Sequence, residues 1–104
     1  MVKNTITLET AQLWASNWRR NPENSVKAFL IPSTDITELL EYEGVTDVRT
    51  YVGIDERGTH KLMLVGVDAD GNDLINDVKG QYIYDFTKPC PPVCDVNSPL
   101  FKLP

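Results

Sequence analysis

The two cysteines of the chain, Cys90 and Cys94, lie in the segment 88–95 (Lys-Pro-Cys-Pro-Pro-Val-Cys-Asp), which also contains three of the seven prolines. Proline fixes φ and removes a backbone donor, so this segment is expected to be neither a helix nor an interior strand. Two thiols on a stiff loop can close to a disulfide, bind a metal as thiolates, or simply pack. The Cys-x-x-x-Cys spacing matches no strong motif for any of these roles.

A redox role requires that the two thiols can form a disulfide. Four residues of polyproline-like chain span about 12 Å, whereas a disulfide needs Cα atoms roughly 4.4–6.8 Å apart. Closure therefore needs a chain reversal, at Val93 or through a cis bond at one of the prolines. Redox enzymes of the thioredoxin type place Cys-x-x-Cys at a helix N-terminus, which lowers the pKa of the first thiol. Neither that spacing nor that helix is evident here.

A metal role would use Cys90 and Cys94 as zinc ligands, with His60 and Asp95, or a second chain, completing the set. Structural zinc takes four ligands, and the sequence has no second cysteine pair and no other histidine. Nothing in the sequence places His60 near the tail. The favoured interpretation is two reduced cysteines that pack a rigid arm, because free cysteine behaves as a small buried hydrophobe. No cofactor is expected, and zinc is the alternative.

Motifs for other chemistry do not emerge. There is no Gly-x-Ser-x-Gly and no glycine-rich phosphate loop, so the sequence leans against an enzyme without settling the question. The acidic run 68–73 resembles part of a calcium loop, but Asp73 and Lys79 occupy the positions that an EF-hand reserves for Gly and Glu. A polar hairpin turn explains this run better, because Asp and Asn bond their own backbone.

Apolar periodicity predicts the elements that hold these residues. Residues 8–20 form an amphipathic helix with Thr7 as N-cap. Its apolar face carries Trp14 and Trp18, which either belong to the core or form an aromatic groove for a ligand or partner. Residues 26–31 form a buried strand, residues 33–43 a second helix, and residues 48–55, 61–67 and 81–86 three strands joined by tight turns.

This order predicts an α+β fold in the sequence α-β-α-β-β-β. We expect two layers: a mostly antiparallel sheet of about four strands, with two helices on one face. Residues 1–86 form this domain. Residues 87–104 form an irregular, proline-rich arm that docks on the sheet through apolar residues such as Leu100 and Phe101.

The charge distribution limits the partners. The net charge is −5, and residues 31–80 hold eleven acids against four bases. An acidic middle offers no basic stripe for nucleic acid or for an anionic membrane surface. No 18-residue apolar stretch is present, and the first residues lack the apolar run of a signal peptide. We therefore expect a soluble, cytoplasmic, acidic protein.

The run 84–95, together with Val65-Gly66-Val67-Asp68, resembles a family of small bacterial proteins with a Cys-Pro-Pro-x-Cys tail. The resemblance implies a stand-alone single domain, and it implies no activity and no site residues. The sequence thus predicts an interaction or accessory module that binds a protein partner or a second copy of itself. The alternative is a thiol-redox or metal-binding protein that acts through Cys90 and Cys94.

Overall fold

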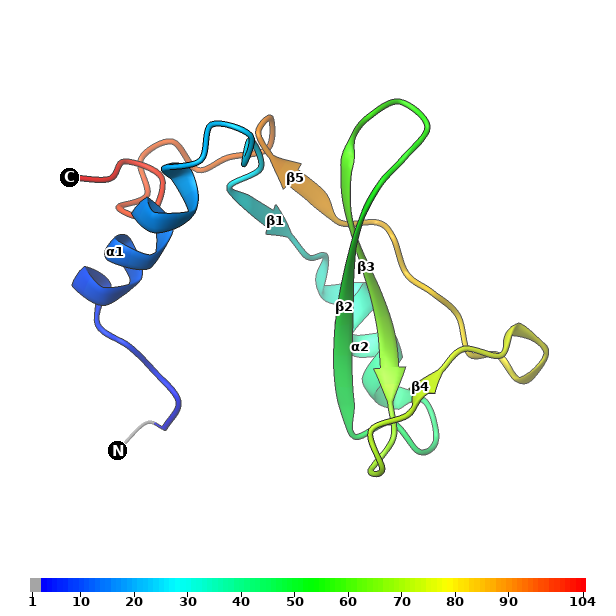
Figure 1. Ribbon diagram of the computed structural model, residues 1–104. Helices are drawn as coiled ribbons and strands as arrows, with labels where there is room; N and C mark the ends of the chain where they lie inside the picture. Colours follow the sequence, from blue (N-terminus) through cyan, green and yellow to red (C-terminus); the bar gives the residue numbers. More distant parts are fainter. Residues whose placement is uncertain (1–2) are drawn as a thin grey trace.

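The computed structural model describes residues 3–104 and has the expected α+β class, with two helices and five strands in two antiparallel sheets (Figure 1). The sheets have the strand orders β1-β5 and β2-β3-β4. The elements are α1 (Leu8–Arg19), β1 (Ala28–Leu30), α2 (Ser33–Glu41), β2 (Asp47–Ile54), β3 (His60–Val67), β4 (Asp73–Leu74), the 3₁₀ turn η1 (Asp77–Lys79) and β5 (Lys88–Cys90).

Helix α1 begins where its capping signal predicts. The side chain of Thr7 accepts a hydrogen bond from the backbone N–H of Thr10 at 3.1 Å, which satisfies one of the free donors of the first turn. Glu9 lies in the first turn and Arg19 in the last, and both charges complement the helix dipole. The beginning and end of the helix are therefore marked by local sequence signals.

Strands β2 and β3 form a regular hairpin of eight paired residues. The carboxylate of Asp55 accepts the backbone N–H groups of Arg57 and Thr59, both at 2.9 Å, and Gly58 takes the positive φ that the turn requires (81°). On the other side of β3, the backbone of Leu64 exchanges two hydrogen bonds with Tyr84 (2.8 and 2.9 Å). β3 is thus the central strand of this sheet.

The core lies where α2 packs against β2 and β3. Leu39 of α2 is fully buried, and Leu64 and Val65 of β3 are 1% exposed. Val45 approaches the backbone of Gly66 so closely that a Cβ at position 66 would lie 2.7 Å from one of its methyl groups. The missing side chain at Gly66 therefore lets Val45, which follows α2, pack closely against β3.

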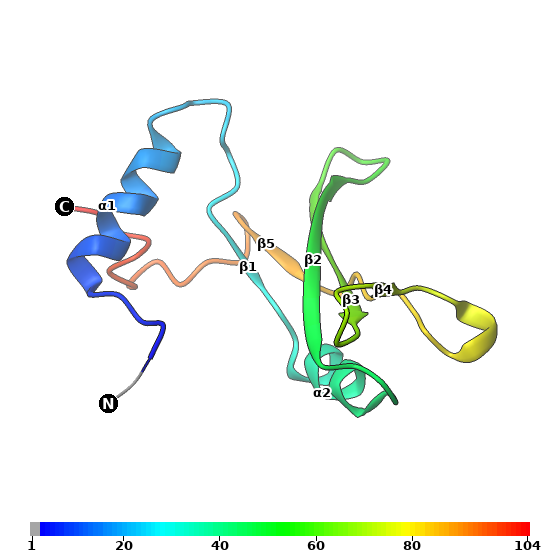
Figure 2. The same ribbon diagram turned by 60° about the horizontal axis from the view of Figure 1, so that its bottom comes forward.

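Two details differ from the sequence prediction. The segment 81–86 contributes only isolated bridges at Gln81 and Tyr84, because the side chain of Thr87 takes up the N–H and C=O of Leu62. Helix α2 lies against the three-stranded sheet, whereas α1 lies apart from it beside the C-terminal arm (Figures 1 and 2). The two helices therefore do not share one face of that sheet.

The arm that follows Phe86 is partly regular. Its first residues form β5, which pairs antiparallel with β1 so that Pro89 lies opposite Phe29. Proline is tolerated there because β1 and β5 form a two-stranded sheet, in which a missing donor disturbs little. No helix among residues 3–104 has the length and apolar character needed to cross a bilayer.

The chain leaves an unusually large surface uncovered. Its accessible surface is 7786 Å², whereas a compact monomer of this mass exposes about 5,900 Å². The radius of gyration is 15.9 Å, against about 12.9 Å for a compact chain of this length. Among residues 3–104, nineteen large apolar or aromatic side chains are at least 38% exposed.

Candidate functional site

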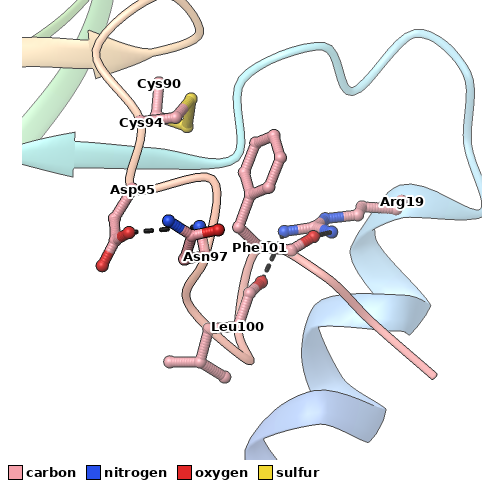
Figure 3. Close-up of a disulfide and its surroundings, with 7 residues drawn as sticks. All are labelled: Arg19, Cys90, Cys94, Asp95, Asn97, Leu100 and Phe101. Atoms are coloured by element: carbon pink, nitrogen blue, oxygen red, sulfur yellow. Dashed lines mark hydrogen bonds between the residues drawn. A yellow bond between two sulfur atoms is a disulfide. The ribbon is translucent and has the colours of Figure 1, made fainter.

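Cys90 and Cys94 are joined by a disulfide, with Cα atoms 4.9 Å apart (Figure 3). The chain reversal that closure requires lies inside the ring: the N–H of Val93 donates to the carbonyl of Pro89 at 2.9 Å. The Cys90–Pro91 and Pro91–Pro92 bonds are cis. The favoured expectation of two reduced cysteines therefore differs from the structure, because the turn at 89–94 brings both sulfurs together.

Side chains of α1 fasten the arm. Arg19 donates from Nη1 to the carbonyl of Phe101 (2.8 Å) and from Nη2 to the carbonyl of Leu100 (2.7 Å) (Figure 3). Its guanidinium lies 5.9 Å from the centre of the Phe101 ring, within reach of a cation–π interaction. Gln12 donates to the carbonyl of Pro99 at 3.0 Å. Three successive carbonyls of the arm are thus held by one helix.

A cleft of about 460 Å³ lies between α1, β1 and the arm, within the size range of ligand sites. Its walls are mainly apolar or aromatic. Trp14 is 57% exposed and Leu100 45% exposed, so both present surface to whatever enters. The lining comprises Ile6, Ala11, Trp14, Ala15 and Arg19 on one side, Lys27, Ala28, Phe29 and Leu30 from β1 and its approach, and Cys90, Val93, Cys94, Asp95, Ser98, Leu100 and Phe101 from β5 and the arm.

The backbone of β1 forms one border of the cleft. Lys27, Ala28, Phe29 and Leu30 are consecutive, and all four line it. Because successive side chains of a strand point to opposite faces, four consecutive lining residues are consistent with a cleft that reaches the edge of the strand. Within residues 3–104, β1 pairs with β5 alone, so its other edge has no partner strand. The cleft therefore combines apolar walls with unpaired backbone groups.

Charged groups lie at the cleft on both sides. Lys27 is exposed, and the carboxylate of Asp95 accepts the N–H of Asn97 at 3.2 Å. The Nε atom of Arg19 is buried without a hydrogen-bond partner, while its two Nη atoms are engaged by the arm. Arg19 therefore serves mainly to hold the wall of the cleft.

The structure brings together most of the residues that the sequence singled out. Trp14, Leu100, Phe101, Asp95 and both cysteines all line this cleft. Two residues lie elsewhere and are not part of it. The indole of Trp18 donates to the carbonyl of Val26 at 2.6 Å, and His60 lines a separate hollow of about 200 Å³ with Pro89, Pro91 and Pro92.

The metal alternative finds no ligand cluster in the described part of the chain. No group of three or more His, Cys, Asp or Glu side chains there could hold an ion. In the disulfide, moreover, both sulfurs are bonded to each other and are not thiolates.

Sequence reasoning missed the strand edge. Phe29 and Val93 line the cleft, but residues 26–31 were expected to form a strand buried on both faces. Only the short apolar run ended by Pro32 signals a strand there, and such a run does not reveal which edge will stay unpaired.

A second cluster of titratable groups lies between α2 and the strand region. The hydroxyl of Tyr84 donates to the carboxylate of Glu38 at 2.9 Å and bonds the hydroxyl of Tyr42. Partial burial, reinforced by these two bonds, raises the pKa of Tyr84 far above its ordinary value. The neutral phenol ties the segment 81–87 to α2, which is a structural role.

The acidic turn after β3 also proves structural. The Asp68 carboxylate accepts the backbone N–H of Asn72 at 2.9 Å and that of Asp70 at 3.0 Å. The bond from Asn72, above all, lowers the pKa of Asp68. Its oxygens are committed to the turn, as expected for a hairpin, rather than gathered around an ion.

Comparisons with protein families, with curated proteins and with solved structures find no match to this chain.

Proposed function

We propose that this protein is a non-enzymatic interaction module that binds an extended, apolar segment of another protein in the cleft between α1, β1 and the arm. The observation that carries the proposal is the unpaired edge of β1 inside an apolar cleft. A peptide that adds to a sheet edge gains affinity from main-chain hydrogen bonds and specificity from pockets for alternate side chains.

The parts of the cleft match these two requirements. The edge of β1 supplies the backbone donors and acceptors. Trp14 from α1 and Leu100 from the arm supply apolar surface on the sides, and both are about half exposed in the free chain. Tryptophan is among the residues that commonly dominate binding energy at interfaces, which makes Trp14 the expected anchor.

The test uses a random linear peptide library displayed on phage, because the natural partner is unidentified. Enriched peptides are then synthesised and titrated against Trp14→Ala and, as matched control, Leu13→Ala. Leu13 is 55% exposed on the same helix but does not line the cleft. Binding should weaken at least about tenfold, or 1.4 kcal/mol, for Trp14→Ala and stay unchanged for Leu13→Ala. Peptides that bind both variants equally, or an absence of enrichment, would contradict the proposal.

The alternative is a thiol-redox protein, favoured by one observation: the Cys90–Cys94 disulfide forms part of the cleft wall. In such a reaction the two thiols of the reduced protein would be oxidised to this disulfide while a partner disulfide is reduced to two thiols. The assay is reduction of insulin disulfides by dithiothreitol with and without the protein. Acceleration that disappears in Cys94→Ser would favour the redox alternative, and equal rates would favour the interaction module.

A further inference from the structure

Strand β2 has a long free edge on the opposite part of the molecule. It runs for eight residues and pairs with β3 on one side, and within residues 3–104 no strand pairs with its other side (Figures 1 and 2). Its apolar residues are strongly exposed: Tyr51 by 44%, Val52 by 69% and Ile54 by 66%. This surface is separate from the cleft, since no residue of β2 lines it.

The hydrogen-bond pattern identifies which backbone groups face outward. At the hairpin the N–H of Asp55 donates to the carbonyl of Thr59 at 3.0 Å, and on the far side of β3 Leu64 exchanges bonds with Tyr84. In an antiparallel ladder, residues alternate between bonding one neighbour and the other. The odd-numbered residues of β2 therefore bond β3. The outward N–H and C=O groups belong to Val48, Thr50, Val52 and Ile54.

Proline, lysine and a bulge, three of the usual protections of an edge strand, are missing from β2. Proteins shield such edges with proline, lysine, a bulge or a covering segment. β2 contains neither proline nor lysine, and its eight-residue register with β3 is uninterrupted. Its one basic residue, Arg49, is engaged by the carboxylate of Asp73 within the same sheet. The edge is therefore open to another strand.

We propose that β2 pairs antiparallel with β2 of a second copy of this chain, about a two-fold axis through Thr50. The two three-stranded sheets then form one continuous sheet. In this register Thr50 lies opposite the partner's Thr50, Val48 opposite the partner's Val52, and Arg49 opposite the partner's Tyr51.

Parity and charge select the register of this two-fold pairing. A two-fold pairing must join outward-facing residues to outward-facing residues, so only even-numbered positions of β2 can bond each other. Among the registers with long overlap, one centred on Tyr51 would place Asp47 opposite the partner's Asp55. Like charges directly opposite are destabilising. The register centred on Thr50 opposes no like charges and joins Val48 to Val52 twice by symmetry.

The amount of uncovered surface fits this assembly. The chain exposes 7786 Å², about 1,900 Å² more than a compact monomer of its mass. A standard interface buries about 800 Å² on each partner. The excess surface is therefore large enough for both a β2–β2 interface and a segment bound in the cleft. The cleft itself does not suit a second sheet edge, because α1 and the arm wall it on two sides.

The first experiment is disulfide trapping with Thr50→Cys. Opposite residues of a hydrogen-bonded antiparallel pair have Cα atoms about 5.5 Å apart, which suits a disulfide. Oxidised glutathione should therefore join two Thr50→Cys chains, taking up two electrons and two protons as the bond forms. The matched control is Thr46→Cys, which is also exposed but would lie about 27 Å from its symmetry mate. Equal cross-linking of the two variants, or none for Thr50→Cys, would overturn the proposal.

The second experiment measures mass in solution by sedimentation equilibrium. The wild-type chain should sediment as a dimer, and Val52→Lys should raise the dimer dissociation constant at least about tenfold, or 1.4 kcal/mol. Val52 is exposed, so the substitution should leave the far-ultraviolet circular dichroism unchanged and report on assembly alone. A wild-type monomer at all accessible concentrations would overturn the proposal, as would an unchanged dimer in Val52→Lys. An open edge that pairs only with a different protein would appear as the first of these outcomes.

Discussion

Replacing Arg19 with alanine should release the C-terminal arm from α1. Arg19 makes two charge-assisted bonds to carbonyls of the arm, at 2.7 and 2.8 Å, and its guanidinium covers the ring of Phe101. Hydrogen bonds to charged groups contribute about 1.5–3 kcal/mol each when well buried. Here one bond is exposed and the other partly buried, so we expect a combined loss of about 2 kcal/mol in the free energy of unfolding.

The assay is urea unfolding followed by tryptophan fluorescence, because Trp14 and Trp18 both belong to α1 and report on its surroundings. Arg20→Ala is the matched control: Arg20 follows Arg19, is exposed, and its side chain makes no hydrogen bond within residues 3–104. Surface substitutions of that kind change stability by less than about 0.5 kcal/mol. Arg19→Lys should fall between the two, since an ammonium cannot reproduce the guanidinium fork.

Limited proteolysis adds a local readout of the same perturbation. Phe101 is partly covered in the folded chain, so chymotrypsin should cut after it faster in Arg19→Ala than in Arg20→Ala. Equal stabilities and equal cleavage rates for the two variants would refute the reasoning, because the arm would then be held by contacts other than those of Arg19.

Three further predictions concern the disulfide, the sheet and the acidic turn. Changing Cys90 and Cys94 together to alanine should cost about 2 kcal/mol by the chain-entropy model for so small a ring, and wild-type protein in dithiothreitol should unfold at the same urea midpoint as this variant. Gly66→Ala should cost about 1–3 kcal/mol through overpacking, and Val45→Ala should restore part of that loss in the double variant, as measured by thermal unfolding. The pKa of Asp68 is lowered in the folded state. The ionised carboxylate therefore stabilises the fold above the ordinary carboxyl pKa, and this stabilisation is lost as pH falls through the lowered value. Asp68→Asn keeps a hydrogen-bond acceptor but does not titrate, so it should flatten the acid limb of the curve of unfolding free energy against pH.

The elements with strong local signals were predictable from sequence. Helix α1 has a capping threonine and a regular apolar stripe. In the β2–β3 hairpin, β2 alternates with period two, the turn contains Gly58, and β3 is a short apolar run. These signals act over a few residues, so no tertiary information is needed to read them. The α+β class followed from their order along the chain.

The elements that were predicted wrongly depend on contacts between distant segments. Strand β5 lies in a proline-rich stretch, and Pro89 is acceptable there only because it faces Phe29 in a two-stranded sheet. The segment 81–86 reads as a strand, yet the side chain of Thr87 takes bonds that a ladder would have used. Hydrophobic periodicity does not encode these strand pairings, because they depend on which distant segment of the chain packs against each strand.

The candidate site was half predictable for the same reason. Residue types alone pointed to Trp14, Leu100, Phe101 and the cysteine pair, and the structure gathers all of them around one cleft. The unpaired edge of β1 carries no such compositional mark. Whether an edge is free depends on every other strand of the molecule, which a local pattern cannot contain.

The two free edges differ in what they can accept, and that difference follows from their surroundings. β1 offers three residues inside a cleft walled by α1 and by an arm that Arg19 and the Cys90–Cys94 ring hold in place, so it admits a single extended segment. β2 offers eight residues, and no strand within residues 3–104 pairs with its outer edge, so it admits a whole sheet edge. A chain that pairs with itself through β2 would carry two clefts related by the same two-fold axis. Linked sites of this kind bind a bivalent partner more tightly than either cleft alone when the spacer spans them, so Val52→Lys should weaken binding of a tandem peptide while leaving the affinity of a single peptide unchanged.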